Sequence, residues 1–458
     1  MSTPPRTKAS QTERGLVPQL QAAYTPIERT AVYSLNWCLS NWAWFLIAGV
    51  WLVFVMLLYF FATRSPLGLG AFYVYFESAK ALISLDTIYS GITGWIYLYP
   101  PLLAQTLMPL AALNDSALAV NLWLGFNIGL LLATMNMLAH YVPRRYTKLL
   151  WVMPVFFVPI WQAMYIGQVT IIMLALLAGV WVAVHENRPF LAGALLALAS
   201  WIKVFPALLV LYFLWRRDWH VIKGVIIGGF GLLALQVIIS GPNLMLAFFD
   251  VLFSLFLNGQ PEATYENLSI FAFVSRLFQV NRHVVPLLVD ENLFNIARIA
   301  LTVGVFVIGF LAITRSQKRT TSSRHGWRFD VEFSLVIVTI LLLGSTLWIS
   351  GLPPLLLTSV LILRNARHYR WSRAIKVTWL LSMILIMMYQ PLLIVLTRLS
   401  GAVDALVLSI GFFGVMLFWG LMVALLVSQH RPAQVMALAN QEAEKVDAVA
   451  RQRSMRSA

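Results

Sequence analysis

The sequence predicts an all-α, polytopic integral membrane protein with about twelve transmembrane helices. Hydrophobic residues make up 60% of the 458 residues and charged residues only 11%, whereas a soluble domain carries about 25% charged residues. The mean hydropathy is +0.79. Apolar runs of about 20 residues, which is the length of a helix that crosses a bilayer, recur along the chain. Basic residues gather in alternate connections between these runs.

The apolar runs divide into a spanning class and a shorter or interrupted class. The spanning runs are 42–62, 117–141, 221–240, 293–314, 333–350, 374–397 and 405–428. The shorter runs are 149–166, 169–185, 189–202, 204–215 and 352–363. Together they give twelve candidate spans, and an even number places both termini on the same side of the membrane.

The distribution of basic residues predicts which side that is. If the N-terminus is cytoplasmic, the cytoplasmic segments hold 26 of the 33 lysines and arginines. Cytoplasmic loops of membrane proteins carry an excess of lysine and arginine. The formal net charge of +15 is therefore a signal of topology, and no nucleic-acid partner is needed to explain it.

The chain divides into a polar N-terminal segment, 1–41, a transmembrane domain, 42–428, and a cytoplasmic tail, 429–458. The first run has no small-residue cleavage site and is long enough to remain as a span. A single cysteine, Cys38, excludes an intramolecular disulfide. We expect a multi-pass protein of a bacterial plasma membrane with both termini in the cytoplasm.

Two external segments, 63–116 and 241–292, are much longer than the other connections. Both are partly apolar and aromatic, so we expect them to fold back as helices along the membrane surface. A cavity covered by such segments suits a lipid substrate. We see no internal repeat of the kind that transporters often show.

Lys203 interrupts an apolar stretch, 189–215, and Pro206 follows three residues later. A lysine at the centre of a spanning helix costs roughly 2.5–3.5 kcal/mol on insertion scales. A proline lacks an N–H group and weakens a continuous helix. We therefore expect two short helices that meet near a membrane face, with the ammonium group at their junction. It could bind a phosphate there, or it could extend to water without a specific partner.

The first external segment carries the acidic residues Glu77 and Asp86. A reaction that activates a hydroxyl group needs a general base, and a carboxylate can serve as one. Glu77 could instead pair with Lys80 on a surface helix, and Asp86 could cap a helix or turn. Tyr99 is followed by two prolines, which favour an extended backbone before the next apolar run.

Two further positions offer polar side chains. Gly167 and Gln168 join two short apolar runs; glycine permits a close backbone approach, and glutamine both donates and accepts hydrogen bonds. A tight helical turn explains the pair as well. In the second external segment Asn267 precedes Arg276, and arginine binds phosphate with two parallel hydrogen bonds. A nonspecific headgroup contact is the alternative for this arginine.

The residues contain no metal-ligand cluster, nucleotide-binding loop or Ser/His/Asp arrangement, so no metal or cofactor is expected.

The order of these features resembles glycosyltransferase family 87. The matching stretches are YVYFESAKAL, IYSG and YLYPPLLAQTLMPLAAL in the first external segment, and the run from Gly167 to Trp219, which contains Lys203 before Pro206. Asn267, with Ser269 and Arg276, resembles a third patch. The similarity covers roughly residues 45–310. It implies a GT-C-like helical fold and a glycosyltransferase that uses a polyprenyl-phosphate-linked sugar, typically mannose.

The resemblance implies roles for particular residues. It assigns Lys203 and Arg276 to the donor phosphate, and Tyr99, Gln168 and Asn267 to the orientation of substrate. The family's expected catalytic aspartate falls at Ala71 in this chain, and alanine cannot accept a proton. Glu77 or Asp86 would then act as the base.

We therefore expect a hexosyltransferase that transfers a sugar, with mannose as the first candidate, to a glycolipid or glycan acceptor among the membrane lipids at the external face. The alternative is a non-enzymatic lipid-binding or transport protein on the same fold, which has lost the base with Ala71.

Overall fold

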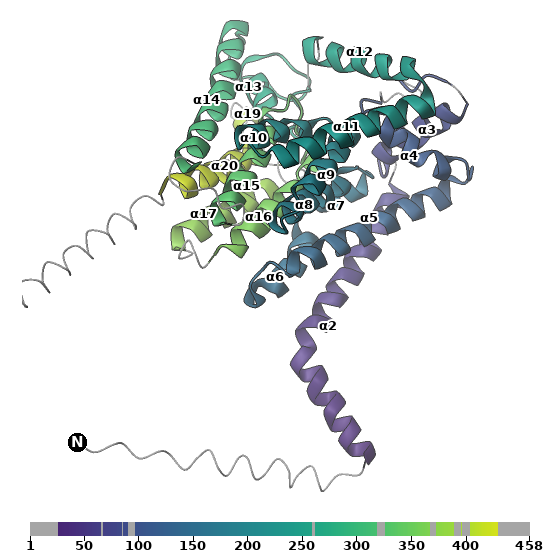
Figure 1. Cartoon of the computed structure of the whole chain (residues 1–458). Coiled ribbons are helices and arrows are strands. Elements are labelled where there is room, and N and C mark those ends of the chain that lie inside the picture. The colour runs from purple at the N-terminus through teal and green to yellow at the C-terminus, as the bar shows by residue number, and fades with distance from the viewer. Residues whose placement is uncertain are drawn as a thin grey trace, which may run out of the picture. The chain divides into compact units, whose positions relative to one another are not determined.

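The computed structural model describes residues 26–65, 67–84, 86–89, 97–258, 262–317, 326–366, 372–388, 395 and 404–428. The described residues form helices joined by turns and loops, and their one β contact is an isolated bridge between Asn267 and Trp348 (Figure 1). The first helices are α2 (Pro26–Arg64), α3 (Gly70–Ile83), α4 (Pro101–Ala111), α5 (Ser116–Ala139), α6 (Arg144–Phe156), α7 (Val158–Tyr165), α8 (Thr170–His185), α9 (Pro189–Ile202), η1 (Phe205–Leu208) and α10 (Leu209–Trp215). The others are α11 (Trp219–Ser240), α12 (Pro242–Asn258), α13 (Ile270–Phe278), α14 (Glu291–Gln317), α15 (Trp327–Leu343), η2 (Ile349–Gly351), α16 (Pro354–Arg364), α17 (Arg373–Met387), α19 (Asp404–Val407) and α20 (Ile410–Ser428).

The all-α membrane fold is confirmed, but the count of about twelve spans is not. Five helices of the described part are long and apolar enough to cross a membrane, or six if the bent pair α6 and α7 forms one span. The remaining apolar helices are 10 to 17 residues long, which is shorter than the roughly 20 residues of a straight span. The apolar runs were therefore located well, but several are too short to count as spans by length.

Two compact units divide the chain, Met1–Met56 and Leu57–Ala458. In the first unit the described residues form the beginning of α2. The second unit contains all the other helices. The two long connections, 63–116 and 241–292, contain helices in this unit, namely α3 and α4 in the first and α12 and α13 in the second.

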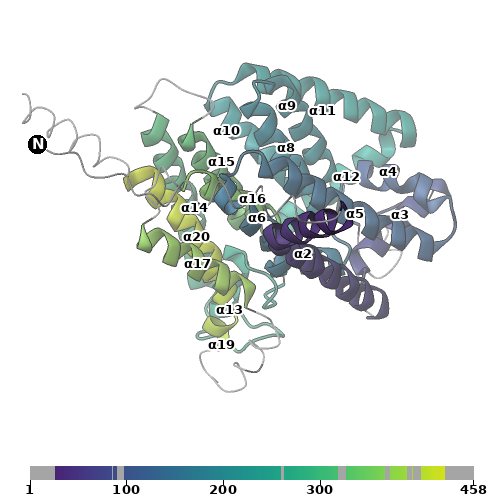
Figure 2. The same ribbon diagram turned by 90° about the horizontal axis from the view of Figure 1, so that it is seen from below.

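Helices α9 and α11 lie side by side (Figures 1 and 2) and meet at two glycines. A Cβ atom on Gly193 would stand 2.0 Å from the carbonyl oxygen of Val221, and one on Gly224 would stand 2.1 Å from that of Phe190. No larger residue fits at either position without separating the helices. The close crossing holds the first turns of α9 at a fixed place in the bundle.

Two buried carboxylates on α15 bind arginines from other helices. Asp330 is 1% exposed and pairs with Arg364 at the end of α16, and Glu332 is 2% exposed and lies 2.7 Å from Arg216 at the end of α10. The indole N–H of Trp181 on α8 also donates to Asp330, at 2.8 Å. A buried charge is stable only with such partners, so these contacts fix α8, α10, α15 and α16 at one end of the bundle.

Candidate functional site

Four side chains from separate parts of the chain converge at the opposite end of α8 and α9. The Tyr75 hydroxyl group donates to Gln168 Oε1 at 2.8 Å, and the Tyr99 hydroxyl lies 3.4 Å from the same oxygen. The two hydroxyl oxygens are 3.2 Å apart. The Nζ atom of Lys203 is 5.5 Å from the centroid of the Tyr99 ring. We call these four residues the tyrosine cluster; three of them, Tyr99, Gln168 and Lys203, were selected from the sequence.

Lys203 lies where the sequence predicted a break. Helix α9 ends at Ile202, and Lys203 adopts an extended backbone with φ −147° and ψ 128°. A short 3-10 helix that contains Pro206 follows. The half-buried ammonium group thus lies beyond the C-terminal end of α9, where the helix dipole favours a cation.

Gln168 is placed by a tight C-terminal turn of α7. Gly167 has φ +71°, its N–H donates to the Met164 carbonyl, and the Gln168 N–H donates to the Ala163 carbonyl at 2.7 Å. This is the Schellman arrangement, which requires a left-handed residue after the helix and therefore favours glycine. A Cβ atom on Gly167 would also stand 2.6 Å from Cβ of Phe72. The glycine thus serves both the turn and the close approach of α3.

Helix α3 begins against this same turn. The N–H groups of Leu69 and Ala71 donate to the carbonyls of Tyr165 and Ile166, at 2.8 and 2.9 Å. Those carbonyls end α7, so each helix end satisfies backbone groups of the other. Ala71 and Tyr75 are four residues apart, and therefore lie on the same face of α3.

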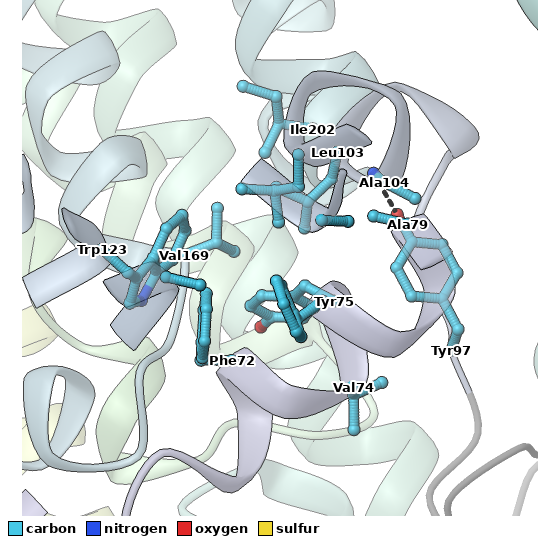
Figure 3. Packing of buried hydrophobic residues seen from close by; sticks show 14 of the residues in the cluster. Phe72, Val74, Tyr75, Ala79, Tyr97, Leu103, Ala104, Trp123, Val169 and Ile202 are labelled. Atoms are coloured by element: carbon cyan, nitrogen blue, oxygen red, sulfur yellow. Dashed lines mark hydrogen bonds between the residues drawn. The ribbon is translucent and has the colours of Figure 1, made fainter. Parts of the chain in front are cut away.

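Tyr99 is held by the start of α4. Pro100 is extended, with φ −54° and ψ 151°, and α4 begins at the next proline, as the sequence predicted. The Leu102 N–H group then donates to the side chain of Gln236 on α11 at 3.0 Å. The Tyr97 hydroxyl donates to the Pro100 carbonyl and accepts from the Ala104 N–H (Figure 3).

The sequence analysis missed Tyr75 and Trp123. Figure 3 shows both rings beside Phe72 and Val169, and the rings of Phe72 and Trp123 are 5.4 Å apart. Trp123 also donates from its indole N–H to the Gly167 carbonyl at 3.1 Å. The four-residue helical spacing from Ala71 to Tyr75 was the one sequence signal that could have indicated Tyr75. The contacts of Tyr75 with Gln168 and of Trp123 with Gly167 join residues more than 40 positions apart.

The charge of Lys203 changes the acidity of the cluster. Burial by itself raises the pKa of Tyr99, but the positive charge of Lys203 and the hydrogen bonds with Tyr75 and Gln168 outweigh it and lower the pKa below its ordinary value. Burial raises the pKa of Tyr75 well above its ordinary value, and the neighbouring Tyr99 adds to the rise. An anionic group is thus favoured on the Lys203 side of the cluster.

The contacts of Gln168 define what its amide can offer a substrate. Its oxygen accepts from Tyr75 and lies close to the Tyr99 hydroxyl, while its Nε2 group has no hydrogen-bond acceptor among the described residues. An amide nitrogen only donates. With Lys203, which also only donates, the cluster presents donors to an incoming oxygen of a phosphate or a sugar.

Glu77 and Asp86 make their contacts with residues outside the tyrosine cluster. Glu77 Oε1 lies 3.0 Å from Lys80 Nζ, and both side chains are about one-third exposed. Glu77 is two residues beyond Tyr75, about 200° around α3, so it projects from another face. Asp86 is exposed and follows the C-terminal end of α3, where its N–H donates to the Ala81 carbonyl.

Asn267 and Arg276 come together in a second, fully buried group. Arg276 Nη1 donates to the carbonyls of Thr264 and Asn267, at 2.6 and 3.0 Å, and its Nε donates to Ser409 Oγ at 3.0 Å. Its Nη2 has no hydrogen-bond partner among the described residues. Burial lowers the pKa of Arg276 to about 9, so the guanidinium stays charged at neutral pH. The Asn267 side chain links Glu262 to the Leu347 N–H.

Glu266 is a third residue that was not predicted from the sequence. Its carbonyl accepts from the Ile349 N–H at 3.2 Å, and the next residue, Ser350, accepts at its carbonyl from Thr170 at 2.5 Å. Glu266 therefore lies at the end of the bundle where α8 begins. Burial raises the pKa of its carboxyl group, a property that general acids and bases often share.

In the described part of the chain, no three histidine, cysteine, aspartate or glutamate side chains lie close enough to hold a metal ion.

Comparisons with known proteins give one family. The model of glycosyltransferase family 87 matches residues 97–344, which include Tyr99, Gln168 and Lys203. No curated protein sequence matches the chain. Among solved structures, the chain is similar to the crystal structure of ArnT from Cupriavidus metallidurans bound to undecaprenyl phosphate, with 13% identity, a TM-score of 0.42, and coverage of 88% of this chain and 81% of that chain. At this TM-score, nothing about the site follows from the similarity.

Proposed function

Since this chain belongs to glycosyltransferase family 87, we propose that it transfers a hexose, with mannose as the first candidate, from a polyprenyl-phosphate donor to a glycolipid or glycan acceptor at the external face of a bacterial plasma membrane. The observation that carries the proposal is the tyrosine cluster. It gathers a cation and an uncommitted amide donor within the family-matched region.

The proposed reaction is an inverting transfer. A base removes the proton of the acceptor hydroxyl, the acceptor oxygen bonds to the anomeric carbon, and the bond from that carbon to the phosphate oxygen breaks. The leaving polyprenyl phosphate gains negative charge, and fixed donors and cations at that point lower the barrier. We assign Lys203 and Gln168 to the phosphate side, with Tyr99 as the residue that orients the amide.

Arg276 is a second candidate for the phosphate. Its side chain is 0% exposed, and Nη2 is the guanidinium nitrogen that other described residues leave without a partner. A phosphate contact would therefore use Nη2. Asn267 would act indirectly, because its carbonyl accepts from Arg276 and its side chain ties this segment to the Leu347 N–H group.

Three carboxylates are candidates for the base. Glu77 lies on α3, the helix that carries Tyr75, and the exposed Asp86 follows the end of this helix, where it can reach acceptors in solvent. Glu266 is the candidate that the structure adds, because it is half-buried with a raised pKa and lies at the same end of the bundle. Ala71 lies on the same face of α3 as Tyr75, and alanine provides no proton acceptor at that position.

The central experiment measures transfer from a polyprenyl-phosphate sugar by the purified protein in liposomes. Lys203→Met should weaken donor binding roughly tenfold or more, because a charge-assisted hydrogen bond contributes about 1.5–3 kcal/mol. Lys223→Met, which removes an exposed cation at the other end of the bundle, is the matched control. Equal donor binding by Lys203→Met and wild type would refute the phosphate assignment.

The base is tested by Glu77→Gln, Asp86→Asn and Glu266→Gln in the same assay. Loss of a general base lowers the rate by roughly 10²–10⁴. Asp115→Asn is the control, because Asp115 only caps α5 through the Leu118 N–H. If all three variants transfer sugar at the wild-type rate, none of the three carboxylates is the base. Binding of the donor without transfer by wild type, together with a gain of transfer in Ala71→Asp, would favour the alternative of a lipid-binding protein that has lost its base.

A further inference from the structure

A second pocket lies at the end of the bundle away from the tyrosine cluster. It has a volume of about 580 Å³ and lies between the turn that joins α5 to α6 and the end of α16. His140, Tyr141, Arg144, Arg364 and Asn365 supply its polar lining. We call it the turn pocket.

The turn pocket is separate from the candidate active site. Arg364 Nη2 lies 3.1 Å from His185 Nε2, at the last residue of α8, whereas Gln168 precedes the first residue of α8. The 16 residues of α8 span about 24 Å at 1.5 Å per residue. A ligand in the turn pocket therefore cannot touch the tyrosine cluster.

Buried partners fix one cation of the pocket in place. Arg364 pairs through Nη1 with Asp330, and the Asn365 amide donates to the same carboxylate at 2.7 Å. The guanidinium also lies over the Trp181 ring, 5.2 Å from its centroid. These contacts hold an 18% exposed side chain in one orientation, so binding a ligand there costs little side-chain entropy.

Arg144 provides the uncompensated charge. Asp330 neutralises Arg364, and Glu186 accepts the Tyr141 hydroxyl at 2.6 Å. Arg144, by contrast, is exposed and has no ion-pair or hydrogen-bond partner in the described ranges. The pocket thus combines one preorganised guanidinium with one that is free to bind an anion, and arginine matches the oxygen geometry of phosphate.

The position of the pocket points to the membrane surface. Helix α5 is a candidate span of 24 residues, Ser116–Ala139, and His140 and Tyr141 follow it directly. A residue just beyond a span lies at the depth of lipid phosphates. From this depth and the two arginines we infer that the turn pocket binds a phosphate group, as carried by an anionic phospholipid headgroup or by inorganic phosphate.

The test uses two neighbouring arginines as a matched pair. Arg144 lines the pocket, whereas Arg145 is exposed and stacks on Tyr146, 4.6 Å from its centroid. Phosphatidylglycerol is titrated into the full-length protein in phosphatidylcholine nanodiscs, and bound lipid is counted by native mass spectrometry. Arg144→Gln should weaken phosphatidylglycerol binding roughly tenfold or more, because a charge-assisted hydrogen bond to the phosphate contributes about 1.5–3 kcal/mol. Arg145→Gln should lose at most the general attraction of one basic residue to an anionic surface, about 1 kcal/mol or fivefold.

A parallel titration separates the two sources of phosphate. Inorganic phosphate is added to the protein in pure phosphatidylcholine nanodiscs, and the melting temperature is followed. If phosphate raises the melting temperature of wild type but not of Arg144→Gln, and phosphatidylglycerol is not bound selectively, the pocket binds free phosphate. The inference is overturned if wild type shows neither selective phosphatidylglycerol binding nor a rise in melting temperature with phosphate. It is also overturned if Arg144→Gln and Arg145→Gln weaken phosphatidylglycerol binding equally. The melting temperature without ligand verifies that both variants fold.

Discussion

At the scale of the residue, the Gln168 amide is held from one side. Tyr75 donates to its oxygen at 2.8 Å, and the Lys203 ammonium lies near the Tyr99 ring. An ammonium group can only donate hydrogen bonds. The hydroxyl groups of Tyr75 and Tyr99 therefore direct their own hydrogens toward the amide oxygen of Gln168. Within the described residues, this leaves the amide nitrogen free for the contact with a substrate oxygen that we propose.

Tyr75→Phe tests this orientation. The phenylalanine keeps the ring, which meets Tyr99 edge-on at 5.1 Å, but removes the hydroxyl that holds the amide. A hydrogen bond contributes about 0.5–1.5 kcal/mol, so we expect the donor KM to rise roughly three- to tenfold with little change in melting temperature. Tyr165→Phe, which removes a hydroxyl bonded to Ser65 instead, should leave KM unchanged. An unaltered KM in Tyr75→Phe would show that the amide is positioned by other contacts.

Glu266 makes the stability depend on pH. Burial raises the pKa of its carboxyl group in the folded state, so the folded chain binds a proton more tightly than the unfolded chain does. Stability should therefore fall as pH rises from the ordinary carboxyl range through the raised pKa. Glu266→Gln removes this loss and should flatten the decline in melting temperature as the pH rises above the ordinary carboxyl range of about 4.3. The same slope in Glu266→Gln and wild type would contradict the prediction; Glu262→Gln, an exposed neighbour, is the control.

At the scale of the element, helix packing depends on glycines at particular positions. The α9–α11 crossing admits no Cβ atom at Gly224, which faces the Phe190 carbonyl at 2.1 Å, whereas nothing lies within 4 Å of a Cβ atom on Gly231 of the same helix. The crossing lies at the first turns of α9 and Lys203 follows its last turn, so a shift of the whole helix would also move the candidate site.

Gly224→Ala and Gly231→Ala separate packing from helix propensity. Overpacking typically costs about 1–3 kcal/mol, so Gly224→Ala should lower the melting temperature and weaken donor binding, because it pushes α9 away from α11. Gly231→Ala should be neutral or stabilising by up to about 1 kcal/mol. The measurement is thermal unfolding in detergent with a donor titration. Equal melting temperatures for the two variants would refute the tight crossing.

Much of the arrangement of elements could be predicted from the sequence. The limits of α9 coincide with the run 189–202, and the break at Lys203 and Pro206 is present, because local chemistry determines both. Whether helices of 10–17 residues cross a membrane depends on their tilt and packing, which apolar length does not reveal. The pairing of Tyr75 with Gln168 spans 93 residues, and no periodicity predicts it.

At the scale of the whole molecule, the bundle has two chemically different ends. Helix α8 runs from the tyrosine cluster to His185, α9 runs from Pro189 to Ile202, next to Lys203, and α16 runs from Pro354 to Arg364. At one end lie the hydroxyl, amide and ammonium donors of the candidate site. At the other lie the buried acid–arginine pairs and the turn pocket. The helices thus separate a candidate reaction site from a basic surface.

The last prediction assigns these ends to sides of the membrane. Basic residues resist translocation, and 26 of 33 fall in the segments expected to be cytoplasmic. Lys148 is exposed on the short basic helix α6, and Glu262 is exposed in the second long connection. With Cys38 replaced by serine, Glu262→Cys should react with an impermeant maleimide in intact cells. Lys148→Cys should react only after permeabilisation, because it lies on the retained basic surface.

The same labelling decides where the proposed transfer occurs. If Lys148→Cys reacts in intact cells and Glu262→Cys does not, the basic end is external, and the tyrosine cluster would open to the cytoplasm. A donor phosphate bound by Lys203 would then have to be presented from the inner leaflet. If Glu262→Cys alone reacts, the tyrosine cluster and Glu266 lie on the external side, where a polyprenyl-phosphate sugar that has crossed the membrane can meet its acceptor.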